Sequence, residues 1–169
     1  MKVGGEGNWL VFILLLTIQR AWAIVTGSLE AIFYLGDRKK AKRKLKDAQK
    51  SIQHTLDLEF WYKREGISAY KRDWLDRWSF PWVTIAKKKG DCEDFMLLAH
   101  SILKKNLECH QCLVYGKKGG KRSGHAVLLV KEGDRWALMS NYNRYIWFDT
   151  MDDAAKKFYG EDTASYYIF

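Results

Sequence analysis

Two short segments contain the residues whose types and spacing suit chemistry. Cys92 lies in the run Gly-Asp-Cys-Glu-Asp-Phe at 90–95, and His125 lies in the run Gly-His-Ala-Val at 124–127. A thiol becomes a nucleophile at neutral pH when something helps it lose its proton and a base or counter-charge is held beside the sulfur. The N-terminus of a helix supplies the first, and an imidazole from a neighbouring strand supplies the second. The two segments therefore predict a cysteine nucleophile that a histidine activates.

A third side chain has to orient the imidazole. Asn141 follows His125 at a suitable distance along the chain and would orient the ring without a charge. Ser140 would do so only weakly, and Asp149 is a further candidate. The order cysteine, histidine, then asparagine or aspartate is that of papain-like and transglutaminase-like triads. We predict Cys92, His125 and Asn141 as the catalytic triad.

The segment from about Tyr70 to Asn143 resembles the bacterial transglutaminase-like cysteine peptidases, a group of the papain-like and transglutaminase superfamily. Trp78 and Pro81 match the Trp-x-x-Pro segment of that group, residues 90–94 match its Gly-Asp-Cys-Glu-Asp run in full, and residues 125–127 match its His-Ala-Val run. The combination is fairly specific, although neither half alone would be. The resemblance covers under half of the chain.

The resemblance implies a cysteine peptidase or amide hydrolase that acts on a protein or peptide substrate and requires no cofactor for its chemistry. The chain departs from the family at one place, since Ser140 and Asn141 stand where the family has Asp-Asn. A neutral partner stabilises an imidazolium ion less than a carboxylate does, so this departure weighs against full activity. The alternative is a non-catalytic module that keeps the fold and serves assembly, in a virion or a membrane complex.

An oxyanion intermediate needs hydrogen-bond donors aimed at the developing charge. The backbone N–H of Cys92 is one candidate, because it lies in the first turn of a predicted helix. Trp78, in the aromatic segment upstream, is our candidate for the second donor. A packed indole with no role in chemistry is the competing interpretation of Trp78.

The carboxylates of Asp91, Glu93 and Asp94 crowd the nucleophile in the sequence and should raise the thiol pKa. A bound cation would offset that effect. Some bacterial transglutaminase-like peptidases bind calcium through the acidic residues that flank the cysteine, so the resemblance implies a calcium site at Asp91 and Glu93. Helix capping by Asp91 with a solvent-exposed Glu93 is the alternative, because calcium needs six or more oxygen ligands.

The elements that position these residues can be predicted from periodicity. An amphipathic helix is expected over 37–62, a short helix from Pro81, and a third helix that Asp91 caps and whose first turn holds Cys92. Strands are expected at 109–115, 126–130, 135–139 and 145–148. Helices followed by strands predict an α+β fold in which the catalytic helix packs on an antiparallel sheet. The resemblance implies that the core of this fold is transglutaminase-like, of the papain-like type.

The N-terminal segment is apolar, and we expect a helix over Trp9–Leu35 that extends the fold. We divide the chain into this extension, residues 1–36, and a transglutaminase-like domain, residues 37–169. Three interpretations of the extension stay open: a helix that associates with the domain or a partner chain, a membrane anchor, and a secretory signal. Arg20 penalises insertion into a bilayer, and Glu6 weakens a signal. These features favour a cytoplasmic or membrane-associated protein over an exported one.

Charge and the remaining cysteines complete the analysis. The formal net charge is +9, and seven of the nine residues at 38–46 are basic. No nucleic-acid-binding motif accompanies them, so we expect solvated surfaces and not a nucleic-acid partner. Cys109 and Cys112 form a single Cys-x-x-Cys pair beside His110. One such pair falls short of the four ligands that zinc normally takes, and buried strand residues are expected.

Overall fold

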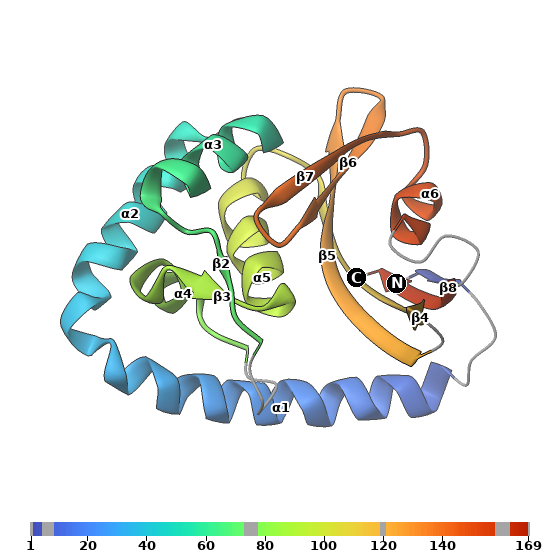
Figure 1. The fold of residues 1–169 in the computed structure, drawn as a ribbon, viewed down its shortest axis with the longest axis horizontal. Coiled ribbons are helices and arrows are strands. Elements are labelled where there is room, and N and C mark those ends of the chain that lie inside the picture. The colour runs from blue at the N-terminus through green and yellow to red at the C-terminus, as the bar shows by residue number, and fades with distance from the viewer. Residues whose placement is uncertain (1, 5–8, 73–77, 119–120, 158–162, 169) are drawn as a thin grey trace.

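A computed structural model of the chain describes residues 2–4, 9–72, 78–118, 121–157 and 163–168. A six-stranded sheet with helices on both faces organises the fold (Figure 1). All the strand pairs of this sheet are antiparallel, and a separate parallel pair joins β2 to β3. In sheet order, the six strands are β1 (Lys2–Gly4), β8 (Thr163–Ile168), β4 (Cys109–Lys118), β5 (Lys121–Glu132), β6 (Arg135–Ser140) and β7 (Asn143–Phe148).

The helices and the small strand pair precede most of the sheet in the chain. They are α1 (Trp9–Phe33), the 3-10 turn η1 (Leu35–Asp37), α2 (Arg38–Ser51), α3 (Thr55–Glu65), β2 (Ala69–Tyr70), α4 (Pro81–Lys87), β3 (Lys89–Gly90) and α5 (Cys92–Leu103). One short helix, α6 (Met151–Lys156), follows β7. The predicted α+β fold is confirmed: α5, with the predicted nucleophile as its first residue, packs on the antiparallel sheet.

Both faces of the sheet are buried, which explains the unbroken apolar run in β5. Ala126, Leu128 and Val130 contribute to the core beneath α5, while Val127 and Leu129 contribute to a second core that α6 covers. Because successive side chains of a strand point to opposite faces, a strand covered on both sides is apolar at every position. The sheet is therefore a rigid support for residues at its ends.

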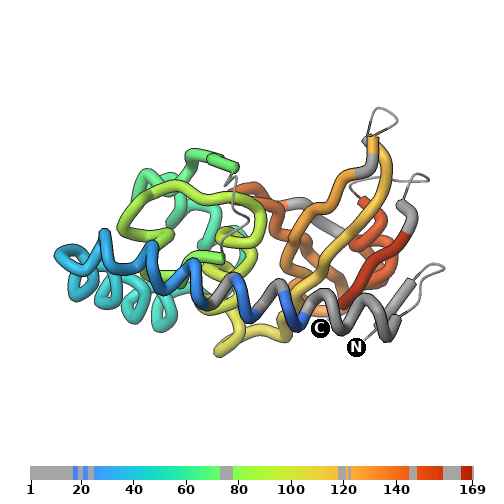
Figure 2. The backbone as a smooth tube through the Cα atoms, turned by 90° about the horizontal axis from the view of Figure 1, so that it is seen from below, coloured from blue at the N-terminus to red at the C-terminus, as the bar shows by residue number. Residues whose placement is uncertain are grey.

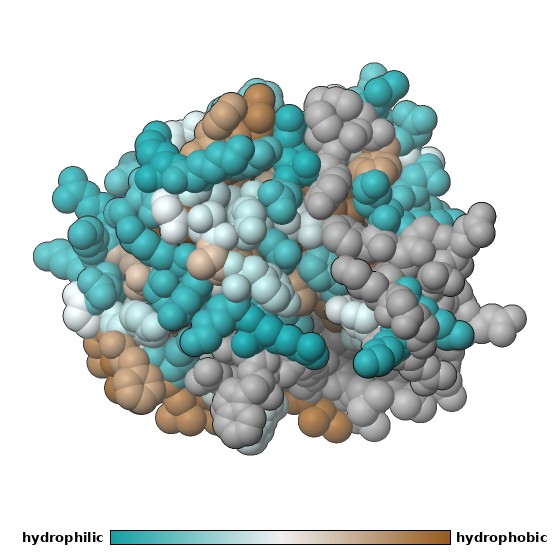
Figure 3. All heavy atoms as spheres, viewed as in Figure 1, coloured by the Kyte–Doolittle hydropathy of each residue, from teal (hydrophilic) through white to brown (hydrophobic). Residues whose placement is uncertain are grey.

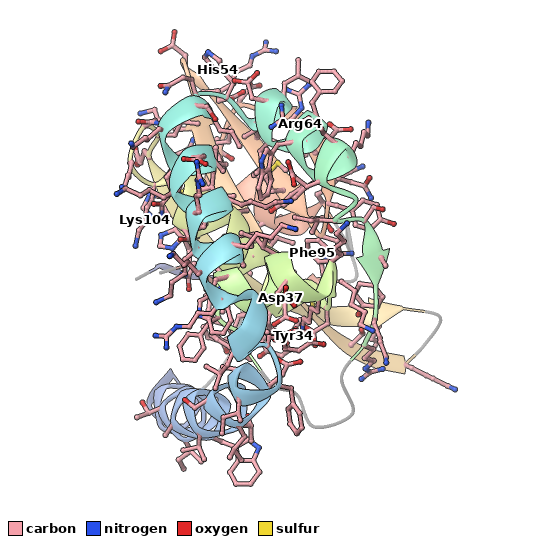
Figure 4. All side chains as sticks on the ribbon, turned by 90° about the vertical axis from the view of Figure 1, so that its left-hand side faces the viewer. Tyr34, Asp37, His54, Arg64, Phe95 and Lys104 are labelled. Carbon is pink, nitrogen blue, oxygen red and sulfur yellow. The ribbon has the colours of Figure 1, made fainter. Side chains whose placement is uncertain are left out.

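The helical layer is centred on α5. Phe95, one turn after the start of α5, is fully buried and meets the rings of Tyr62 and Tyr142 edge to face, with centroids 5.8 and 5.6 Å away. Figure 4 shows Phe95 inside this layer and Tyr34 and Asp37 at the junction between α1 and α2. The core thus fixes the first turn of α5 relative to the sheet.

The single amphipathic helix predicted over 37–62 is wrong: α2 ends at Ser51 and α3 begins at Thr55. Ile52 takes an extended conformation, and its carbonyl accepts a hydrogen bond from the Asn106 side chain at 2.8 Å. The break changes which face of the second helix is buried, so that Leu58, Trp61 and Tyr62 are buried and Phe60 is exposed. A continuous 3.6-residue pattern concealed the break because the apolar residues of the two helices happen to continue it.

The N-terminal helix α1 lies along one edge of the molecule and is docked on the helical layer (Figures 1 and 2). Its contact face carries small and polar residues, among them Thr26, Gly27, Glu30 and Ala31, all of which are buried. Gly27 is required there, because a Cβ at that position would lie 2.4 Å from the Trp78 carbonyl oxygen. Among the described residues, no helix combines the length and the apolar content needed to cross a bilayer.

Candidate active site

The N-terminus of α5 presents Cys92 in the way the sequence predicts. Asp91 is the N-cap, and its Oδ1 accepts a hydrogen bond from the Asp94 backbone N–H at 3.3 Å. Gly90 lies tightly against the same turn, because a Cβ there would come within 2.7 Å of the Asp94 Cβ. Cap and glycine together set the first turn of the helix, where backbone N–H groups have no intrahelical partner.

The Cys92 thiol lies between α5 and the strand that carries His125. It is 8% exposed, and the backbone of Ala126, the residue after His125, lies near enough to the sulfur to lower the pKa of the thiol in part. The sulfur also donates a hydrogen bond to Glu93 Oε2 at 2.9 Å. Burial, and then the charge and hydrogen bond of Glu93, raise the pKa of the Cys92 thiol well above its ordinary value. In this arrangement the thiol is protonated, and its hydrogen is directed to Glu93 rather than to His125.

His125 is held by a side chain from the next strand. Its Nε2 atom lies 2.8 Å from Ser140 Oγ, and Ser140 is the last residue of β6, the antiparallel neighbour of β5. Ser140 is almost fully buried, so its hydroxyl is constrained by packing. With Nε2 bonded to Ser140, Nδ1 is the ring nitrogen that would exchange a proton with a thiol.

The hydrogen bond predicted for Asn141 is therefore made by Ser140. Asn141 lies beyond the end of β6 in a left-handed conformation with φ of 52°, and its buried Oδ1 has no hydrogen-bond partner. Asn is one of the residues that tolerate this conformation, which the turn into β7 requires. The other candidate, Asp149, pairs with Arg135 at 3.5 Å, and Arg135 is at the opposite end of β6 from Ser140. Neither residue orients the ring in this structure.

Trp78 has an unsatisfied donor of the kind an oxyanion needs. Its indole Nε1 is buried and meets no hydrogen-bond partner among the residues that the structure describes. The neighbouring Ser79 donates its backbone N–H to Asp94 Oδ1 at 2.7 Å, which ties this segment to the first turn of α5. A buried polar group without a partner is costly, and such groups in native structures call for an explanation. The predicted role of Trp78 in oxyanion binding stays a prediction.

The two carboxylates predicted to bind calcium both have protein partners. Asp91 caps α5, and Glu93 accepts the thiol hydrogen bond. In the part of the chain that the structure describes, no three histidine, cysteine, aspartate or glutamate side chains group closely enough to hold a metal ion. A calcium ion takes at least six oxygens, more than the carboxylates of Asp91 and Glu93 supply by themselves. The calcium site stays a prediction for titration.

The Cys-x-x-Cys pair lies on β4, the strand that follows α5 in the chain. Cys112 is fully buried and Cys109 is half-buried, and burial raises the pKa of each thiol to about 12. His110 pairs with Glu108 at 3.1 Å. Both cysteines are thus residues of a strand whose thiols are partly or fully buried, as expected from the sequence.

Sequence reasoning missed a buried polar network behind the site. Lys87 of α4 bonds Asp94 of α5 at 2.8 Å, Ser79 Oγ at 2.7 Å and Glu30 of α1 at 3.3 Å. Glu30 lies far from the other three in the chain, and polar residues of these types are usually found at the surface. The network joins α1, α4 and α5 and fixes the segment that carries Trp78.

A comparison with protein families settles the relationship. A family model described as a transglutaminase-like domain matches residues 18–146. The chain belongs to the transglutaminase-like family. The match spans α5, β5 and β6, and so includes Cys92, His125 and Ser140; it also includes the docked part of α1. No curated protein matches the chain at a significant level.

Proposed function

We propose that the domain is a cysteine-dependent amide hydrolase or peptidase that acts on protein or peptide substrates. The observation that carries the proposal is the position of the Cys92 sulfur, at the start of α5 and near the backbone of Ala126, the residue that follows a histidine held by Ser140. Nucleophile, base and orienting group come from α5, β5 and β6, three elements that pack together in one core. Membership of the transglutaminase-like family supports the same chemistry.

The reaction follows from these positions. The Cys92 thiolate attacks the substrate carbonyl carbon, and the Cys92 backbone N–H and the Trp78 indole N–H stabilise the oxyanion. His125, holding the thiol proton, gives it to the leaving amine as the carbon–nitrogen bond breaks and a thioester remains. Water then attacks the thioester, His125 takes a proton from that water, and the carbon–sulfur bond breaks to return the thiol and release the acid.

Glu93 has to move before the first step. While the thiol donates to Glu93, the proton is held away from the imidazole and the thiolate is disfavoured. Rotation of the half-exposed Glu93 side chain, or its pairing with a cationic group of a substrate, would release the thiol to His125. We therefore propose that the resting enzyme is poised in a low-activity form that substrate binding activates.

Covalent labelling of the nucleophile tests this function. Full-length protein is incubated with a mixed peptide library and a peptide vinyl sulfone, and covalent adducts are mapped by mass spectrometry. We expect adducts on Cys92, their loss in His125→Ala, and their retention in Cys112→Ala, which alters a buried thiol on β4. Peptide turnover that survives Cys92→Ala would exclude Cys92 as the nucleophile.

A non-catalytic assembly module is the second candidate, and two observations favour it. The raised pKa of Cys92 and the serine in place of a carboxylate at His125 both lower reactivity. This function predicts that Cys92→Ala changes neither folding nor association with partners. The absence of any Cys92 adduct, in a protein that remains folded, would favour this function over the hydrolase.

A further inference from the structure

An apolar stripe runs along the solvent side of α1. Five large apolar residues recur at steps of four and three residues and are each between 56% and 59% exposed: Ile18, Trp22, Val25, Leu29 and Ile32. Phe33 and Leu35 extend the stripe and are exposed as well. Figure 3 shows the apolar residues along the lower edge of the molecule, over α1. A continuous exposed apolar stripe on one helix marks an interaction surface.

The stripe cannot be buried by turning α1 about its axis. The opposite face of the helix is fixed by the close approach of Gly27 to the Trp78 carbonyl and by the ion pair between Glu30 and Lys87. The Lys87 side chain is 5% exposed, so this pair has little contact with solvent. Rotation would break a buried ion pair and drive the apolar side chains against a polar face. Because these contacts fix the inner face of α1, the apolar stripe on its opposite face is directed toward solvent.

The charges around the stripe are mostly basic, and the exposed acidic residue next to it is Asp37, between Leu35 and the start of α2. Glu30 is the only acidic residue of α1, and it is buried on the inner face. Directly after the stripe, α2 begins with a basic cluster whose exposed members are Arg38, Lys39, Lys40, Lys42, Arg43 and Lys46. Figure 1 shows α2 leaving the end of α1, with no described element on the outer side of α1. The whole surface therefore complements a partner that is apolar and negatively charged.

We propose that the apolar stripe of α1 and the basic cluster of α2 dock the protein on an anionic membrane surface, with α1 lying in the plane of the headgroups. An amphipathic helix with apolar and aromatic residues on one side, next to clustered lysines and arginines, binds such surfaces by combining apolar burial with electrostatic attraction. Trp22, near the middle of the stripe, is a residue type enriched at the membrane interface. A second copy of the chain fits less well, because it would bring an equally basic molecule of net charge +9 to the same face.

Vesicle binding by the full-length protein tests the proposal. Cosedimentation is measured with phosphatidylcholine vesicles and with vesicles that contain about one-third phosphatidylserine. We expect binding to the anionic vesicles that is weakened about tenfold or more by high salt, and little binding to the neutral ones. Absence of binding to anionic vesicles, or equal salt-independent binding to both, would overturn the proposal.

Matched variants then separate the two components. Trp22→Ser with Leu29→Ser should weaken anionic-vesicle binding about tenfold, since two apolar anchors are lost. Phe60→Ser is the control, because Phe60 is as exposed as Leu29 but lies on α3. Equal effects of the double variant and the control would show that the stripe is not the membrane contact.

The basic cluster is tested in the same way. Lys39→Glu with Lys40→Glu should lower anionic-vesicle affinity about tenfold, whereas Lys104→Glu with Lys105→Glu, at exposed positions after α5, should not. Circular dichroism checks folding, and the salt dependence of the unaltered protein tests the proposal without any variant.

If light scattering shows a dimer that becomes monomeric in Trp22→Ser with Leu29→Ser, the stripe is instead the interface with a second copy of the chain. Carbonate-resistant insertion would assign it to a spanning segment.

Discussion

The imidazole of His125 is paired with the hydroxyl of Ser140 at 2.8 Å, at the position where the chain departs from the Asp-Asn of similar peptidases. The hydroxyl can hold the ring in place, but it carries no charge to stabilise an imidazolium ion. The structure thus places a hydrogen-bond partner for the imidazole between β5 and β6, but that partner lacks the negative charge that an aspartate would supply. If His125 takes part in the reaction, a charged residue at position 140 should raise the activity and the loss of the hydroxyl should lower it.

Ser140→Asp should raise the rate of Cys92 alkylation by a peptide vinyl sulfone about tenfold, because a charge-assisted hydrogen bond to the imidazolium is roughly twice as strong as a neutral one. Ser140→Ala should lower the rate about fivefold through loss of one neutral hydrogen bond. Stopped-time labelling with a peptide vinyl sulfone measures both changes.

Ser140→Asn is the matched control for that prediction, since it is close in size to aspartate and has no charge. It should give no gain. If Asn141→Ala abolishes labelling while Ser140→Ala has no effect, Asn141 is the orienting residue in solution and the role of Ser140 assigned here is wrong.

Asn141 is the residue predicted from the sequence to orient His125, whereas in the structure Ser140 makes this hydrogen bond. The end of β6 was predicted at 139, and in the structure the strand runs one residue further, to Ser140. Adjacent residues of a strand point to opposite faces, so a shift of one residue at a strand end decides which side chain meets the histidine. The resemblance contained the signal, because it placed Ser140 at the aspartate position of the family.

The start of α5 could be predicted because its determinants are local. Asp91 caps the helix and the apolar positions Phe95, Leu98 and Ala99 recur at helical spacing, so the placement of Cys92 in the first turn followed. The network of Lys87, Asp94 and Glu30 depends on contacts between distant segments, and no local pattern records such contacts. The same is true of the hydrogen bond from Cys92 to Glu93, which requires the side-chain rotamers of both residues.

Glu93→Gln should increase the reactivity of Cys92. Burial and the Glu93 carboxylate raise the pKa of the thiol, so removal of the charge lowers that pKa and increases the thiolate fraction at any pH below it. The pH profile of iodoacetamide labelling should move toward lower pH, and the rate at neutral pH should rise on the order of tenfold for each pKa unit.

Glu108→Gln is the reciprocal control, because Glu108 raises the pKa of Cys109 through its charge. This variant should leave the profile of Cys92 unchanged and affect Cys109 alone. A Cys92 profile that does not move in Glu93→Gln would mean that burial alone keeps the thiol protonated.

Calcium at millimolar concentration should leave the Tm unchanged, because Asp91 and Glu93 already have protein partners. Asp91→Ala should lower stability by about 1 kcal/mol through loss of the cap, and Asp91→Asn should retain most of it. Differential scanning calorimetry with and without chelator measures both. A calcium-dependent rise in Tm that disappears in Asp91→Asn with Glu93→Gln would instead establish the calcium site.

Lys87→Met should destabilise the fold by about 3–5 kcal/mol, because it removes the cation that Glu30 and Asp94 share and leaves two buried carboxylates without it. Lys104→Met, at an exposed position after α5, should change stability by less than about 0.5 kcal/mol. Urea unfolding followed by tryptophan fluorescence measures both variants.

Limited proteolysis tests whether the same network links α1 to the site. In Lys87→Met, proteolysis should release α1 before the sheet is cut. Release of α1 at the same rate as in the unaltered protein would show that the contact of Gly27 with Trp78 holds the helix without the ion pair.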